Sequence, residues 1–217
     1  MEEYQLRLFK TEIANQCQSV LSAEDDLERY FQTIDQLGQQ LLQEAARSDC
    51  DPSRLFDLKN QFPEVGRVWK DISSLLTAAA NISKHLWPLE QDIRKNSRNK
   101  DGAEYLRKHL EIDNNSPLNP YITPSVREMR NNFEHYDSRL EEFARQGGTY
   151  IDSNIGPIGE ISGLRENASS LPQRHFDQKQ WAVIFQNQTL LLRPVIDAVR
   201  SLAQKVQIFQ LPNYPQQ

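Results

Sequence analysis

Residues 129–143 read MRNNFEHYDSRLEEF, and this stretch decides what the rest of the chain is expected to build. Its apolar residues recur at intervals of three and four, which is the spacing of an amphipathic helix. On a helical projection the apolar side chains share one arc, and the polar side chains share the other. The arc expected to be buried holds Val126, Met129, Phe133, Tyr136, Leu140 and Phe143. The polar face holds Arg127, Arg130, Asn131, Glu134, His135 and Ser138.

This helix is expected to begin at Thr123-Pro124, because proline is favoured at the first helical position, and to stop at Gly147-Gly148. Four further segments show helical spacing, and the turn-rich residues 48–66 indicate a loop with one short helix. The four helices are expected from Ser22 to about Arg47, from about Val68 to Trp87, over GAEYLRKHL (102–110) and from about Gln178 to Gln207. Ser22 has an acidic residue three positions on, which is the pattern of a capping box.

Residues 149–177 interrupt this helical pattern just before the last helix. Gly156-Pro157 and Gly159 lie between β-branched residues and indicate a small hairpin or an ordered loop. The last helix has an apolar face that includes Trp181, Ile184, Phe185, Leu191, Leu192 and Val195. The sequence therefore predicts one all-α domain over 1–217, an antiparallel bundle of four to five helices with a small non-helical insertion at about 149–177.

The composition limits the classes of function. The chain has 217 residues and a net charge of −5, which argues against a protein that coats DNA without specificity. Two cysteines do not make a disulfide framework, and no Cys/His spacing resembles a zinc site. Met1 is not followed by the apolar core of a signal peptide, and no apolar run is long enough to cross a membrane. We expect a cytoplasmic protein without membrane contact.

The polar face of residues 125–143 has two interpretations. It can be a solvated surface with an ion pair between Arg130 and Glu134, which are four residues apart. Such a pair stabilises a helix by about a few tenths of a kcal/mol. It can also be a catalytic surface, because histidine is the side chain most often used as a general acid/base, and His135 is flanked by arginines, an amide and acids. An exposed histidine acts on a substrate only when something covers it. A partner helix that presents the same face would supply that cover.

RNNFEH (130–135) resembles the motif of the HEPN superfamily, in which an arginine and a polar residue precede a histidine by a few positions. The continuation EHYD (134–137) resembles a form found in stand-alone bacterial HEPN proteins. The resemblance implies a HEPN-like helical bundle and a symmetric homodimer whose motif helices meet in one cleft. It also implies a metal-independent ribonuclease of a toxin–antitoxin or phage-defence system.

Carried onto this chain, the resemblance assigns roles to His135, Arg130, Asn131 and Glu134 and implies no metal and no cofactor. His135 is expected to be the acid/base that acts on the ribose 2′-hydroxyl or the leaving 5′-oxygen, and Arg130 to stabilise the phosphorane charge. Asn131 is expected to orient the histidine or the phosphate, and Glu134 to fix the histidine or to pair with Arg130. Arg127, Asp137 and Ser138 are expected on the substrate-binding surface. Cleavage would leave a 2′,3′-cyclic phosphate.

Two competing hypotheses remain open. One is a catalytically silent HEPN module that dimerises and binds nucleotide, RNA or a partner protein. The other is a helical scaffold in which the Arg130/His135 pair is accidental. The expected partners are a second copy of the chain, RNA, and an antitoxin or defence protein.

Overall fold

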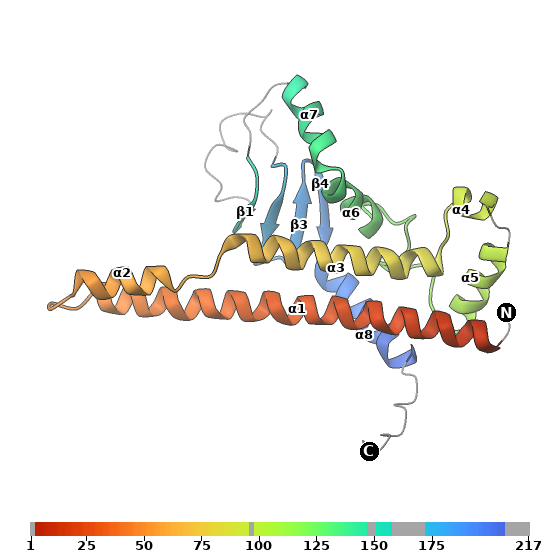
Figure 1. Ribbon diagram of the computed structural model, residues 1–217, viewed down its shortest axis with the longest axis horizontal. Helices are drawn as coiled ribbons and strands as arrows, with labels where there is room; N and C mark the ends of the chain where they lie inside the picture. Colours follow the sequence, from red (N-terminus) through yellow and green to blue (C-terminus); the bar gives the residue numbers. More distant parts are fainter. Residues whose placement is uncertain (1–2, 96–97, 147–150, 158–171, 207–217) are drawn as a thin grey trace, which may run out of the picture.

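Two long helices run side by side in opposite directions through the computed structural model (Figure 1). The structure describes residues 3–95, 98–146, 151–157 and 172–206. The first helix, α1 (Glu3–Ala45), begins well before Ser22, which lies inside the helix and does not cap it. The expected start at Ser22 was wrong because Ile13, Cys17 and Val20 continue the buried stripe toward the N-terminus.

The second long helix, α3 (Val65–Leu86), confirms the helix expected from Val68 to Trp87. Its buried residues lie on several sides, because α1, α6 and α5 all pack against it. Ala78, Ala79 and Ala80 are all buried. Their small side chains let neighbouring helices approach the backbone of α3 closely. This helix is therefore the centre of the described structure.

Short helices extend both ends of this pair. Asp51 caps α2 (Pro52–Asn60), since its side chain accepts a hydrogen bond from the Ser53 amide at 2.9 Å. The helix α2 lies along the last part of α1, and together they form an arm that projects beyond α3 (Figure 1). At the opposite end lie α4 (Glu90–Lys95) and α5 (Arg98–His109). The short helix expected in 48–66 and the helix over GAEYLRKHL are thus confirmed.

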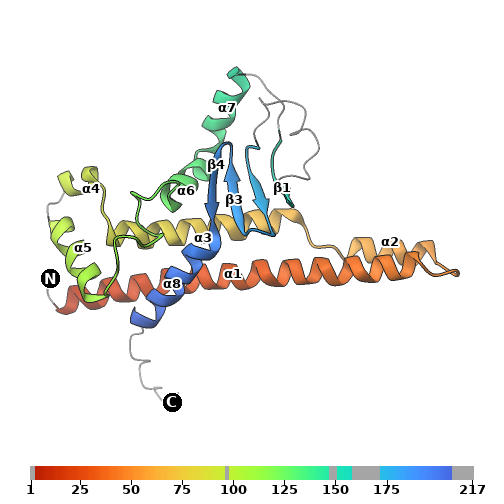
Figure 2. The same ribbon diagram turned by 180° about the vertical axis from the view of Figure 1, so that it is seen from behind.

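The expected all-α fold is wrong, because the mostly helical chain also contains a four-stranded sheet. The strands lie in the order β1 (Asn154–Ile155), β2 (His175–Asp177), β3 (Ala182–Phe185) and β4 (Gln188–Leu191). Pairing is parallel between β1 and β2 and antiparallel for the other two pairs, so the sheet is mixed. Figure 2 shows the sheet standing on the side of α3 that faces away from α1.

The last helix begins only at Leu192, as α8 (Leu192–Val206), and residues 182–191 form the β3–β4 hairpin. Periodicity failed here because a nearly continuous apolar run fits a helical face and a buried strand equally well. Val183 and Ile184 are β-branched and favour the strand. The two-residue turn after Phe185 settles the pairing, with Gln186 at a φ of 53°.

The expected insertion at 149–177 is described only in part. Its two described strands, β1 and β2, run parallel, so they do not form a hairpin with each other. The described hairpins of this sheet are β2–β3, which begins at the end of this segment, and β3–β4, which follows it. Gly159 and the rest of 158–171 lie outside the described residues.

The helix expected from 124 to 147 is divided into α6 (Val126–Glu134) and α7 (Tyr136–Gln146). Ser125 and not Pro124 starts it. The Ser125 hydroxyl accepts from the Glu128 amide, and the Glu128 carboxylate accepts from the Ser125 amide, which is a complete capping box. Figure 1 shows α7 rising away from α3, whereas α6 lies along it.

The helix α8 crosses α1 and is fixed there by charged side chains. Glu24 is 3% exposed, and it accepts from Arg193 at 2.8 Å and from Arg200 at 2.7 Å. Removing either arginine would leave the negative charge of the buried Glu24 carboxylate with less compensation. The two ion pairs therefore fix the position of α8 on α1. No helix among the described residues is long and apolar enough to cross a membrane.

Phe176 on β2 joins the sheet to α1, since it is fully buried and stacks on Phe31 with ring centroids 5.7 Å apart. We expect Phe176→Ala to lower the free energy of unfolding by about 3–5 kcal/mol, through lost burial and the cavity left behind. The matched control is Phe56→Ala, because Phe56 is 65% exposed and its loss should change stability by less than about 0.5 kcal/mol. Urea denaturation measures both, and equal small changes would contradict the sheet packing.

Candidate functional site

His135 lies at the break between α6 and α7. Its backbone, at φ −104° and ψ 33°, has left the helical region. Its amide donates to the Asn131 carbonyl at 3.0 Å, and its carbonyl accepts from the Arg139 amide at 3.1 Å. The side chain is exposed, and among the described residues the imidazole has no hydrogen-bonding partner. The break therefore presents the imidazole to solvent at a bend of the backbone.

Arg130, Asn131 and Glu134 form a contact group on the last turn of α6. Nε of Arg130 lies 2.7 Å from Oε1 of Glu134, an ion pair whose geometry is not that of an aligned hydrogen bond. Nη1 of Arg130 donates to Oδ1 of Asn131 at 3.0 Å. The Arg130 side chain is 20% exposed and the Glu134 side chain 40% exposed, so the pair lies at the surface. The structure thus brings these three predicted residues together, immediately before His135.

Arg127 is buried, although it was expected on the exposed polar face of the helix. It is 6% exposed, and it donates from Nε to the Ser83 hydroxyl at 2.8 Å and from Nη2 to the Trp87 carbonyl at 2.5 Å. These acceptors belong to the C-terminal end of α3, where the last carbonyls of a helix lack partners within it. A cation is also favoured there by the helix dipole. Arg127 is therefore a cap that joins α6 to α3, although the helical projection placed it on the polar face.

Asp137 and Ser138, the other two residues expected to touch substrate, are both exposed on the first turn of α7. The break at His135 puts them on a different helix from Arg130 and Asn131. They flank the α6–α7 junction from its C-terminal side. The single polar face expected along one continuous helix is therefore two shorter faces that meet at His135.

Aromatic side chains anchor the backbone on both sides of His135. Phe133 packs between Trp69 of α3 and Phe185 of β3, with ring centroids 6.0 Å and 6.4 Å away. Tyr136 lies under the guanidinium of Arg174, whose Cζ is 4.0 Å from the ring centroid. Met129 is fully buried one turn earlier. The expectation that Met129, Phe133 and Tyr136 turn inward agrees with these contacts, although both aromatic residues keep partial exposure.

Arg174 and Asp152 are residues of this region that the sequence did not indicate. The Arg174 fork contacts both carboxylate oxygens of Asp152, at 2.9 Å and 2.5 Å, and the Trp69 indole N–H donates to the Ser153 carbonyl at 3.4 Å. Burial acts to raise the pKa of Asp152, but hydrogen bonds from Arg174, Ser153 and the Tyr136 hydroxyl, with the charge of Arg174, outweigh it and hold that pKa below its usual value. No local motif links Asp152 and Arg174 to residues 130–137, so only the fold reveals them.

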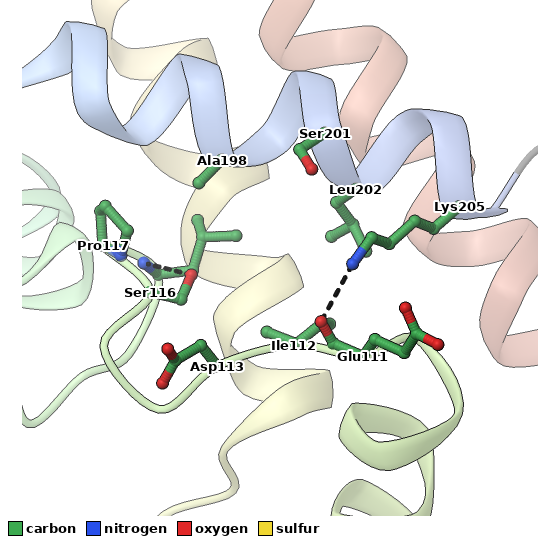
Figure 3. Close-up of a pocket in the computed structure, with 10 residues that line it drawn as sticks. Glu111, Ile112, Asp113, Ser116, Pro117, Ala198, Ser201, Leu202 and Lys205 are labelled. Carbon is green, nitrogen blue, oxygen red and sulfur yellow. Dashed lines mark hydrogen bonds between the residues drawn. The ribbon is translucent and has the colours of Figure 1, made fainter.

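The pocket drawn in Figure 3 lies elsewhere, between the loop after α5 and the helix α8. It has a volume of about 170 Å³, and Nζ of Lys205 closes one end by donating to the Glu111 carbonyl at 2.9 Å. None of the motif residues lines it. Within the described ranges, no three His, Cys, Asp or Glu side chains gather as metal ligands would.

The α6–α7 junction is thus the candidate site, and its chemistry has to be judged from its own residues. No family model, no curated protein and no solved structure matches the chain. The resemblance to the HEPN superfamily remains a prediction carried by residues 130–137.

The two arginines of α6 are expected to behave differently when they are removed. Arg127→Met leaves the buried Ser83 hydroxyl and Trp87 carbonyl without a donor, which costs about 1–3 kcal/mol for each group left unsatisfied. Arg139→Met is the matched control. Arg139 is exposed, and its Nη1 lies 3.5 Å from Oε2 of the exposed Glu142, in an ion pair that contributes less than about 1 kcal/mol to stability. Denaturant titration measures the free energy of unfolding of both variants. An Arg127→Met variant as stable as the wild type would show that Arg127 is not a buried cap of α3.

Proposed function

We propose that the protein is a metal-independent endoribonuclease whose active site forms where the α6–α7 junctions of two copies meet. The observation that carries the proposal is the exposed imidazole of His135, which has no hydrogen-bonding partner in the described part of the chain and lies at a helix break directly after the Arg130–Asn131–Glu134 group. An imidazole acid/base beside a guanidinium is a pair of groups suited to the transesterification of RNA.

The reaction uses one proton carrier on each side of the phosphate. One copy of His135 removes the proton of the ribose 2′-hydroxyl, and the 2′-oxygen attacks the adjacent phosphorus. The bond from phosphorus to the 5′-oxygen breaks, and that oxygen takes a proton from the His135 of the other copy. The products are a 2′,3′-cyclic phosphate and a free 5′-hydroxyl. Arg130 stabilises the charge that develops on the non-bridging oxygens.

The pairing of Arg130 with Glu134 is compatible with this role. The ion pair lies at the surface, where such pairs contribute less than about 1 kcal/mol, so a phosphate can replace the carboxylate. Until then, Glu134 and Asn131 hold the guanidinium on the last turn of α6. The substrate class is single-stranded RNA, because in-line attack by the 2′-hydroxyl needs a backbone that can leave the A-form geometry of a duplex.

A second copy is needed because the residues that the structure describes leave His135 uncovered. A group that transfers protons in bulk water competes with solvent, whereas a closed site excludes it. Two junctions related by a two-fold axis would place two histidines and two arginines around one phosphate, since an isologous interface duplicates every group.

We expect wild-type protein to cleave single-stranded RNA in EDTA and to leave 2′,3′-cyclic phosphate ends. His135→Ala should lower the rate by about 10²–10⁴-fold because it removes the acid/base. Arg130→Ala should be comparably damaging, and Arg130→Lys should recover only part of the loss because a point charge cannot replace a fork. Denaturing gels and mass spectrometry of the products measure both.

The control for these variants is Arg139→Ala, which removes an exposed arginine next to the junction and should leave cleavage unchanged. All of these proteins should unfold at the wild-type temperature, since none of the changed side chains is fully buried. Cleavage that survives both His135→Ala and Arg130→Ala, or that requires magnesium, would assign the activity to another site or to a contaminant. A dimer that binds RNA but never cleaves it would instead identify a silent binding module.

The composite site also predicts the mass of the protein in solution. We expect light scattering at micromolar concentration to give about twice the 25.2 kDa of one chain. Covalent trapping sharpens the test, because Ser138→Cys on the exposed first turn of α7 should form an intermolecular disulfide across a two-fold axis near the junction. A monomer of 25.2 kDa would remove the composite site.

A further inference from the structure

Arg174 makes a set of contacts that joins three parts of the chain far apart in sequence. It lies immediately before β2, and its fork is bound to Asp152 at 2.9 Å and 2.5 Å. Its Nη2 also lies 3.1 Å from the Ser153 hydroxyl. One flat side of the guanidinium covers the Tyr136 ring at 4.0 Å, and Trp69 of α3 lies 5.9 Å away. Arg174 therefore ties the start of α7 to the β1 end of the sheet.

The donors of Arg174 are committed to this cluster, which separates it from Arg130. Its fork is occupied by a carboxylate that is 9% exposed, and its own side chain is 26% exposed. A phosphate would have to displace a largely buried, doubly hydrogen-bonded partner, and this costs far more than displacing Glu134 from Arg130. Arg174 is thus not suited to bind substrate. Its face-on contact with the Tyr136 ring indicates a different role.

Tyr136 is the residue directly after His135, so whatever holds its ring also limits the backbone at the junction. On the other side, Phe133 is held by Trp69 and Phe185. From Tyr136 to Arg145 no side chain of α7 is fully buried, and Tyr136, Leu140 and Phe143 are half-buried. Figure 1 shows the helix extending away from the body of the molecule. The contact with Arg174 is therefore a principal anchor of the first turn of α7.

We propose that Arg174 is a positioning residue that, through the Tyr136 ring, fixes the α6–α7 junction and thereby the placement of His135. The catalytic consequence rests on the ribonuclease function proposed above, whereas the anchoring of the junction does not. Because Asp152 orients the guanidinium, it belongs to the same device. The contact of the cation with the aromatic face needs only the ring, but the Tyr136 hydroxyl also forms a hydrogen bond with the Asp152 carboxylate. Tyr136→Phe should therefore preserve the cation–ring part of the anchor, and Tyr136→Leu should remove both parts.

The first experiment needs no activity. Hydrogen exchange resolved to single amides compares the wild type with Arg174→Gln, Arg174→Lys, Tyr136→Leu and Tyr136→Phe. We expect Arg174→Gln and Tyr136→Leu to speed exchange at the amides of α7 about tenfold or more, with α3 and the first turns of α6 unchanged. Arg174→Lys should lie between, because the ammonium keeps the charge without the flat face and the fork. Tyr136→Phe should speed exchange less than Tyr136→Leu, because it keeps the ring and loses only the hydrogen bond of the hydroxyl to Asp152. The control Arg139→Gln should match the wild type.

The second experiment measures cleavage of single-stranded RNA in EDTA. Arg174→Gln and Tyr136→Leu should each lower kcat about tenfold or more with KM little changed, because misplaced catalytic groups slow the chemical step without removing substrate contacts. The double variant should be no slower than either single variant, since both act through one contact.

The two experiments fail in different ways. Exchange in α7 that does not respond to Arg174→Gln, or that rises uniformly through α3 and α6, overturns the anchoring role and leaves an ordinary stability contact. Faster exchange in α7 with kcat unchanged shows that the anchor does not place His135, which also overturns the proposal. A wild-type protein that cleaves no RNA refutes the ribonuclease function, and the exchange measurements still decide whether Arg174 fixes the junction.

Discussion

The packing of α3 is the constraint on which the rest of this structure depends. Its run of buried alanines lets α1 and the neighbouring elements lie close to its backbone, so small shifts of α3 are not tolerated. The candidate site is held in place by contacts of α6 with this helix. Arg127 ties the first turn of α6 to Ser83 and Trp87 at one end of α3, and Trp69 packs on Phe133 near the other. The helix that carries Arg130 is thereby held at both ends by one buried partner.

Around this fixed helix the site is built from parts with different degrees of restraint. The last turn of α6 holds Arg130 through a surface ion pair that a ligand can displace. The first turn of α7 depends on Arg174, which the carboxylate of Asp152 orients in turn. A fall in pH that protonates Asp152 weakens this contact. Since the pKa of Asp152 is lowered in the folded state, its contribution to stability is present at neutral pH and is lost as pH falls through that pKa.

The sequence predicted the long, strongly periodic helices and missed what depends on distant contacts. The helix α3 has an apolar stripe and a proline after its end, so its position followed from local pattern. The β3–β4 hairpin was missed because its short apolar run suits either period. The break at His135 was missed because Phe133 and Tyr136 keep the helical spacing across it. Arg127 was assigned to the surface because a projection of one helix cannot show the acceptors on α3.

The length of α1 has a consequence for how this molecule moves through water. Its 43 residues form a rod about 65 Å long, at about 1.5 Å per residue. A compact chain of this size has a radius of gyration of only about 17 Å, and twice that value is still far shorter than the rod. The arm built from the end of α1 and α2 projects beyond α3, so the chain has a larger frictional coefficient than a sphere of the same mass (Figure 1). A single chain will therefore diffuse more slowly and leave a sizing column earlier than a sphere of the same weight. Elution volume alone would therefore overestimate the mass of a single chain.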